Sequence, residues 1–275
     1  MNLAEHISKH IATVTGGDFV CTGQQNMGGG CINSAFRLDS KHTSYFVKTN
    51  VAQLKWMFEA EAAGLQAMSD TNTIRVPKPL CSGMTGNHSY LVMEYVQFGG
   101  GRSSSALGEQ LAAMHQHTAE EFGFHVNNTI GSTPQDNTPD TEWIRYWQQK
   151  RLGQQLELAG RNACGNALLT KGERLIEQVP AFFTDYRPRP SLLHGDLWSG
   201  NYSYTSDGQP IIFDPATYYG DREADIAMTE LFGGFGGEFY TAYNSACPLD
   251  AGYKIRKTLY NLYHIINHFN LFGGG

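Results

Sequence analysis

The stretch around Asp207-Gly208 constrains the fold of this chain more than any other. Two β-prone runs flank this dipeptide, a pattern that predicts a hairpin closed by a two-residue turn. In such a hairpin Ser206 would pair with Gln209. Asn201 would then lie across from Asp214. The stretch therefore predicts a strand end at which an amide and a carboxylate lie side by side.

Residues 194–201 read HGDLWSGN and match the pattern H-x-D-L-x-x-x-N of kinase catalytic loops. Phosphoryl transfer requires a carboxylate that orients the attacking hydroxyl and accepts its proton, together with oxygen ligands for Mg²⁺. Asp196 suits the first task, as catalytic base, and Asn201 with Asp214 suits the second. A solvated loop with incidental polar residues is the alternative, but the motif and the hairpin register agree independently.

Lys48 ends a Phe-Val-Lys strand, as the ATP-contacting lysine of kinases does. The helix predicted over 53–68 carries Glu61 as the only charge on its apolar stripe. A buried carboxylate must find a partner or neutralise. We therefore expect a Lys48–Glu61 pair of the kind that holds phosphates in kinases. Glu59 lies off the stripe and is the less favoured alternative.

Two further segments are expected to complete the ATP site. Gly29, Gly30 and Cys31 belong to a glycine-rich stretch upstream of Lys48 and would cover the phosphates, with an ordinary β-turn as the alternative. Glu94-Tyr95-Val96 closes an apolar strand just before another glycine run, which is typical of a hinge between lobes. There the backbone of Glu94 and Val96 would meet the adenine ring.

The secondary-structure pattern predicts an α+β chain with two lobes of a protein-kinase-like fold. Residues 1–96 mix strands and helices and would form a small, β-rich nucleotide-binding N-lobe. Residues 97–275 are mostly helical and would form a larger catalytic and substrate lobe. Clefts between lobes are common sites for small molecules, so we expect the reaction to take place between them.

Composition argues against several classes of protein. The net charge of −6 and the pI near 5.9 disfavour a nucleic-acid partner. No apolar run is long enough to span a bilayer. The five cysteines contain no C-x-x-C pair, which disfavours a zinc site or a disulfide framework and favours the reduced cytoplasm.

The spacing after Asp214 bears on the size of the substrate. Protein kinases place a long activation segment after the metal-binding aspartate, whereas here a helix is predicted to begin near Asp225, eleven residues later. This leaves no room for a peptide-docking segment. The substrate should be small, or a small group that protrudes from something larger.

Several motifs, taken together, closely resemble the fructosamine and ketosamine kinase family over essentially the whole chain. They are residues 194–201, 213–216, 218–225, 231–235, 30–33, 57–61, Ile130-Gly131 and Pro134-Gln135. The resemblance implies the aminoglycoside-phosphotransferase-like variant of the kinase fold. It also implies transfer of the ATP γ-phosphate to the sugar O3 of fructosamine or ribulosamine adducts on amines or protein lysines. The implied role is repair of glycated amines.

Two other functions remain as alternatives. One is a kinase of another small alcohol, such as an aminoglycoside or choline. The other is a non-catalytic pseudokinase, which loss of Lys48, Asp196, Asn201 or Asp214 would favour, but all four are present. Trp198 favours a ketosamine because an aromatic face beside the base suits a sugar ring, although it could instead be a core residue.

The remaining expectations concern supporting residues and the ends of the chain. We expect His194 to lie with Trp198 at the substrate, His115 to be structural and Asp225 to brace the catalytic loop or cap its helix. The resemblance implies that Cys31 can cross-link two copies, so a monomer or a disulfide-linked homodimer is expected. Family members usually continue beyond Gly275, so the last helix is expected to be truncated.

Overall fold

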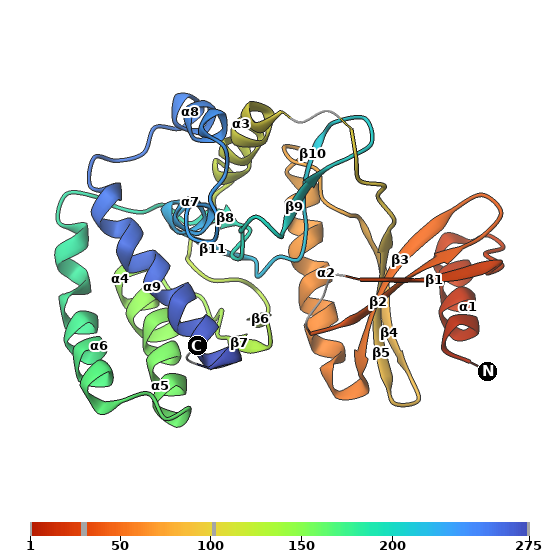
Figure 1. Ribbon diagram of the computed structural model, residues 1–275, viewed down its shortest axis with the longest axis horizontal. Helices are drawn as coiled ribbons and strands as arrows, with labels where there is room; N and C mark the ends of the chain where they lie inside the picture. Colours follow the sequence, from red (N-terminus) through yellow and green to blue (C-terminus); the bar gives the residue numbers. More distant parts are fainter. Residues whose placement is uncertain (1, 29–31, 101–102, 274–275) are drawn as a thin grey trace.

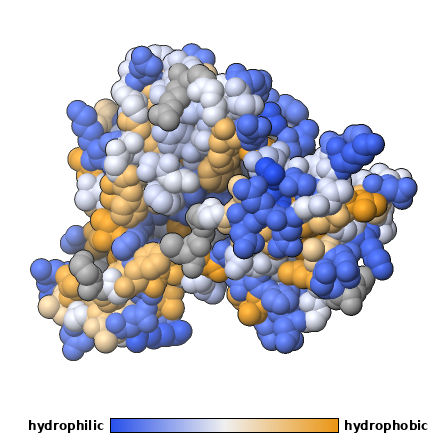
Figure 2. Space-filling model, turned by 45° about the vertical axis from the view of Figure 1, so that its right-hand side comes forward, coloured by the Kyte–Doolittle hydropathy of each residue, from blue (hydrophilic) through white to orange (hydrophobic). Residues whose placement is uncertain are grey.

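The structure is a computed structural model that describes residues 2–28, 32–100 and 103–273. Figure 1 shows a sheet-bearing lobe on the right and a larger, mostly helical lobe on the left. Hydrophobic and hydrophilic residues are interspersed over the face shown in Figure 2, as on most globular proteins. Within the described ranges, no helix is both long enough and apolar enough to cross a membrane.

The smaller lobe contains a five-stranded antiparallel sheet with the order β1-β2-β3-β5-β4. The strands are β1 (Gly23–Met27), β2 (Ser34–Asp39), β3 (Ser44–Val51), β4 (Pro79–Thr85) and β5 (His88–Glu94). Side chains alternate across a strand. In β5, Tyr90 and Val92 therefore pack with helix α1 (Leu3–Thr15), whereas Leu91 and Met93 belong to the core that contains α2. Both faces of the sheet are covered, by α1 on one side and α2 on the other (Figure 1).

Helix α2 (Lys55–Asp70) follows a 3₁₀ turn (Ala52–Leu54) and lies between the sheet and the helical lobe (Figure 1). Its apolar stripe, which includes Phe58, Leu65 and Met68, is buried in the main core. The stripe predicted over 53–68 is therefore confirmed, and it carries Glu61 toward the sheet.

The larger lobe is built mainly from helices. They are α3 (Ser104–His115), α4 (Trp143–Trp147), α5 (Gln154–Arg161), α6 (Asn166–Gln178), α7 (Glu223–Thr229), α8 (Gly237–Ala246) and α9 (Tyr253–Phe272). A π-helical segment (Gln148–Gly153) joins α4 to α5, and a 3₁₀ turn (Val179–Phe183) follows α6. Trp143 and Trp147 are buried against Tyr260, so these tryptophans are core residues.

Three short antiparallel strand pairs lie in this lobe. They are β6 (Asn128–Ile130) with β7 (Thr133–Gln135), β8 (Ser191–Leu193) with β11 (Tyr218–Gly220), and β9 (Tyr202–Tyr204) with β10 (Pro210–Ile212). Each strand has three residues, too few for a clear alternation in the sequence. The pair β6–β7 and strand β11 were accordingly not predicted.

The β9–β10 pair corrects the predicted hairpin register by one residue. Tyr204 pairs with Pro210, and the Thr205 N–H donates to the Gln209 carbonyl at 2.9 Å, so three residues rather than two form the turn. Gly208 takes a left-handed φ of 85°, and the Thr205 hydroxyl accepts a bond from the Gln209 N–H at 2.9 Å. This threonine closes the longer turn, which the dipeptide alone does not reveal. Asn201 therefore lies opposite Phe213, not Asp214.

Candidate active site

Lys48 lies on β3 and points to the α2 face of the sheet. Its Nζ is 2.6 Å from Glu61 Oε1 and 2.6 Å from Asp214 Oδ1. The ion pair predicted between Lys48 and Glu61 is confirmed, whereas Glu59 forms a surface pair with Lys55 at 2.8 Å. One ammonium group therefore connects the sheet, α2 and the segment that follows β10.

The charge on Lys48 is secured by its two carboxylate partners. Burial by itself would lower the pKa of this ammonium, but Glu61 and Asp214 outweigh it and raise the pKa above its ordinary value. Lys48 is therefore cationic at neutral pH. A buried, fixed cation is suited to binding phosphate oxygens.

Asp196 and Asn201 occupy the loop between β8 and β9. Asn201 Nδ2 donates to the Asp196 carbonyl at 2.8 Å and lies 3.3 Å from Asp196 Oδ2. The same amide nitrogen is 3.4 Å from the Asp214 carbonyl. Although the register prediction was wrong, Asn201 still lies between Asp196 and Asp214. It directly precedes β9, and its carbonyl accepts from the N–H of Phe213, the neighbour of Asp214, at 3.0 Å.

Burial, together with the negative charges of Asp214 and Asp225, raises the pKa of Asp196 to about 7. The bond from Asn201 acts in the opposite direction. A carboxylate whose pKa lies near the working pH is well matched to taking a proton from a hydroxyl. The site can therefore support general-base chemistry at Asp196.

His194 does not reach a substrate surface, which corrects the role predicted for it. Its ring is fully buried, with Nε2 donating to the Phe213 carbonyl at 2.9 Å and Nδ1 accepting from the Asp196 N–H at 3.3 Å. Burial lowers the pKa of His194 and keeps the ring neutral. Trp198 is 39 % exposed, and its ring packs over Gly200.

Asp225 braces the catalytic loop, as predicted. Its carboxylate accepts the N–H groups of His194 at 2.7 Å and Gly195 at 2.8 Å. His115 donates from Nε2 to the same carboxylate at 3.2 Å and accepts from the Tyr243 hydroxyl at 2.8 Å, so its predicted structural role is also confirmed. Gly195 has a φ of 82°, and a β-carbon there would lie 2.1 Å from the Ala216 carbonyl oxygen.

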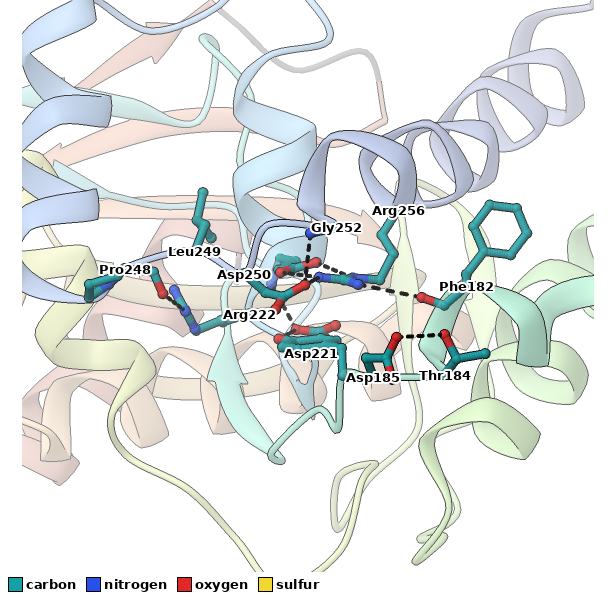
Figure 3. Close-up of polar contacts among 12 residues, drawn as sticks. Phe182, Thr184, Asp185, Asp221, Arg222, Pro248, Leu249, Asp250, Gly252 and Arg256 are labelled. Carbon is teal, nitrogen blue, oxygen red and sulfur yellow. Dashed lines mark hydrogen bonds and ion pairs between the residues drawn. The ribbon is translucent and has the colours of Figure 1, made fainter.

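The helix that carries Asp225 is itself anchored from α9. Arg256 donates to both carboxylate oxygens of Glu223, at 2.7 and 3.0 Å, and to Asp250 at 2.6 Å. Figure 3 shows Arg256 and Asp250 turned toward one another beside Asp221. Glu223 is the first residue of α7, two positions before Asp225. This ion-pair cluster therefore fixes the start of the helix that holds the catalytic loop.

The hinge residues have partners that limit their predicted role. The Glu94 N–H donates to the Lys78 carbonyl at 2.8 Å, and its carboxylate pairs with Arg75 at 2.6 Å. The Glu94 N–H is therefore not free to meet adenine, which corrects part of that expectation. Tyr95 receives the Arg37 guanidinium over its ring, 5.0 Å from the centroid. Gly29, Gly30 and Cys31 lie outside the described residues.

The residues present fit a magnesium ion shared with phosphates. Asp214 has a side chain that is 46 % exposed, and Asn201 brings an amide to the same place. In the described part of the chain, no group of three or more His, Cys, Asp or Glu side chains is arranged to hold a metal. Mg²⁺ commonly takes one or two protein carboxylates, with phosphates and water as the other ligands. The Asp214 carboxylate and the Asn201 amide match this coordination pattern.

Comparisons with known proteins give one answer. The fructosamine kinase family matches residues 3–275. A Synechocystis protein named probable ketoamine kinase is 49 % identical over 272 residues, covering 98 % of this chain and 91 % of that protein. The chloroplastic protein-ribulosamine 3-kinase of Arabidopsis thaliana is 49 % identical over 254 residues, covering 91 % and 78 %.

Solved structures agree on the fold. A chain from Haemophilus somnus assigned as a fructosamine-3-kinase matches with a TM-score of 0.89 at 30 % identity, covering 98 % of this chain and 92 % of that one. The aminoglycoside phosphotransferase APH(4)-Ia in complex with ADP and hygromycin B matches with a TM-score of 0.64 at 13 % identity, covering 96 % and 90 %. The predicted α+β, kinase-like fold is confirmed. The chain belongs to the fructosamine kinase family.

Proposed function

We propose that this chain is an ATP- and Mg²⁺-dependent kinase that transfers the γ-phosphate of ATP to the sugar O3 of ketosamines. The observation that carries the proposal is the ion pair between Lys48 Nζ and Asp214 Oδ1, 2.6 Å apart, which lies beside Asp196 and Asn201. Family membership directs the acceptor toward ketosamines and away from aminoglycosides or choline. The presence of all four polar residues argues against a pseudokinase.

The nucleotide would bind between residues 1–96, which we propose as the nucleotide-binding lobe, and residues 97–275, the catalytic and substrate lobe. Lys48 would bind phosphate oxygens while Glu61 holds its ammonium from the other side. The carbonyl of Glu94 and the backbone of Tyr95 and Val96 remain the groups proposed to contact adenine.

Asp214 and Asn201 would hold the magnesium ion, which when bound neutralises the charge on the phosphates. Their positions do not depend on the ion alone. Asn201 is bonded to the backbone of both Asp196 and Asp214, so one amide ties the base to the metal ligand.

Asp196 would orient the acceptor hydroxyl and take up its proton as the new phosphate ester forms. Its raised pKa favours acceptance of that proton, and the Asn201 bond keeps the carboxylate in place. The exposed indole of Trp198 would lie against the sugar ring, because aromatic faces pack well on apolar sugar faces.

The proposed biological role is repair of glycated amines, since a ketosamine 3-phosphate is unstable and releases the amine. We place the protein in the cytoplasm, on its scattered cysteines. Its oligomeric state is proposed as a monomer that can form a dimer through Cys31 under oxidation.

A coupled ADP-release assay with ribulosamine, fructosamine, aminoglycoside and choline acceptors tests the proposal. We expect acceptor-dependent ADP release with the two ketosamines alone, and phosphorus NMR should place the new ester on O3. Asp196→Asn serves as the control for contaminating kinase activity. Faster turnover of an aminoglycoside or of choline would overturn the assigned substrate.

A further inference from the structure

Three buried amide side chains lie beside the segment that carries Asp214. They belong to the β6–β7 hairpin and the residues just after it, and we call Asn128, Gln135 and Asn137 the amide cluster. Asn128 Nδ2 donates to the Thr217 carbonyl at 2.8 Å, and Gln135 Nε2 lies 3.5 Å from the Ala216 carbonyl. The cluster therefore contacts the backbone two and three residues after Asp214.

The cluster is internally satisfied, which fixes the orientation of each amide. Asn128 Oδ1 accepts from Gln135 Nε2 and from Asn137 Nδ2, both at 2.9 Å. With its oxygen so engaged, Asn128 must present its NH₂ group to Thr217. Gln135 Oε1 accepts from the Tyr263 hydroxyl of α9 at 2.5 Å, and Asn137 Oδ1 accepts from Arg151 at 2.6 Å. A fully partnered buried network of this kind is stiff.

The segment that it contacts needs support from outside. Asp214 has a φ of 59°, in the left-handed region that side chains other than glycine rarely adopt. Such a conformation persists only where surrounding contacts over-determine it. On one side, the Ala216 N–H donates to the His194 carbonyl at 2.9 Å. On the other side lies the amide cluster, so the segment is clamped between the catalytic loop and the β6–β7 hairpin.

The same segment and hairpin also reach the smaller lobe. A β-carbon on Gly64 of α2, one turn after Glu61, would lie 2.6 Å from Thr217 Oγ1. A β-carbon on Gly131, at the hairpin tip, would lie 2.8 Å from Leu271 Cδ1 of α9 and 3.3 Å from Ile32 Cδ1. Close packing at Gly64 therefore places the backbone after Asp214 directly against α2, the helix that carries Glu61.

We propose that the amide cluster is a positioning device for the Asp214 carboxylate. Only a short stretch separates Asp214 from α7. The cluster stabilises this stretch by donating hydrogen bonds to the carbonyls of Ala216 and Thr217. The inference rests on the proposed function, because it takes Asp214 as a magnesium ligand. If the cluster only filled space under the hairpin, its loss would lower stability without changing how Asp214 meets a metal.

The test compares two buried asparagines with the same exposed fraction. Asn128 and Asn267 are each 5 % exposed, and Asn267 accepts from Gln155 in the α5–α9 contact. Asn128→Leu and Asn267→Leu would be titrated with ATP by calorimetry, in Mg²⁺ and in EDTA. For Asn128→Leu we expect the gain in affinity due to Mg²⁺ to fall about 10- to 100-fold, as is usual when a residue behind a metal ligand is lost. Asn267→Leu should keep the wild-type gain even where its melting temperature falls as far.

A second readout requires no metal. In hydrogen exchange on the nucleotide-free protein, the Ala216 amide should exchange faster in Asn128→Leu and at the wild-type rate in Asn267→Leu. Gln135→Met, which keeps the approximate shape but loses the amide NH₂ and carbonyl oxygen, should repeat the Asn128→Leu pattern. A folded Asn128→Leu or Gln135→Met with wild-type Mg²⁺ dependence and exchange would overturn the proposal. If wild-type protein itself shows no Mg²⁺-dependent binding, the proposed function fails instead, and the exchange result still decides whether the cluster clamps the segment.

Discussion

Removing the Asp225 carboxylate should cost the protein a large part of its stability. The carboxylate accepts two backbone N–H groups and the His115 ring, and all of these groups are buried. An unsatisfied buried donor costs about 1–3 kcal/mol. Asp225→Ala leaves these donors without their acceptor, and the two backbone N–H groups alone correspond to a loss of about 2–6 kcal/mol. The whole free energy of unfolding of a native protein is only about 5–15 kcal/mol.

The free energy of unfolding of Asp225→Asn should lie between that of Asp225→Ala and that of the wild type. Its one amide oxygen can keep the bonds to His194 and His115, while its NH₂ group faces the Gly195 N–H. One orphaned donor corresponds to about 1–3 kcal/mol. Urea unfolding followed by circular dichroism measures both free energies of unfolding.

Asp70→Ala is the matched surface control. Its carboxylate accepts from Gln66 on the exposed side of α2, so its loss should change the free energy of unfolding by less than about 0.5 kcal/mol. If the free energy of unfolding of Asp225→Ala lies within about 1 kcal/mol of the wild-type value, the carboxylate does not stabilise the catalytic loop and the reasoning is wrong.

Asp196→Asn should leave Mg–ATP affinity nearly unchanged and lower kcat by about 10²- to 10⁴-fold, and retention of over half the wild-type kcat would exclude Asp196 as the base. Asp214→Ala should abolish Mg²⁺-dependent nucleotide binding in calorimetry, and Asn201→Ala should weaken it less because an amide carries no charge. Equal affinity in Asp214→Ala and wild type would remove Asp214 from the metal site. Because the pKa of Asp196 is raised by burial to about 7 and the base must be unprotonated, kcat/KM should fall as pH drops below that value. A profile that stays flat between about pH 6 and 8 would contradict this. Mild oxidation should give a dimer that dithiothreitol reverses on non-reducing gels, and Cys31→Ser should not form it; the same band in both proteins would exclude Cys31.

Patterns that depend on neighbours in the chain were readable from the sequence. The stripe on α2 left Glu61 as its only charge, and burial of a lone carboxylate demands a cation, so the Lys48 contact followed. The spacing from His194 to Asn201 likewise placed a carboxylate and an amide in one loop. Asp225 could be expected to brace that loop because a helix was predicted to begin near it.

Contacts between distant segments were decided only by the tertiary structure. The register of β9–β10 shifted by one residue because the Thr205 hydroxyl closes a three-residue turn. His194 lost its predicted substrate role because Phe213 and the loop backbone enclose its ring.

The amide cluster had no signal in the sequence beyond isolated polar residues near Pro134-Gln135. Gln135 and Tyr263 are 128 positions apart, and Asn128 and Thr217 are 89 positions apart, so these pairs form only when distant segments pack together. Local sequence determined the elements and their chemistry, because helix periodicity and motif spacing act over a few residues. The partners of buried polar groups depend on how those elements pack, so only the folded chain determined them.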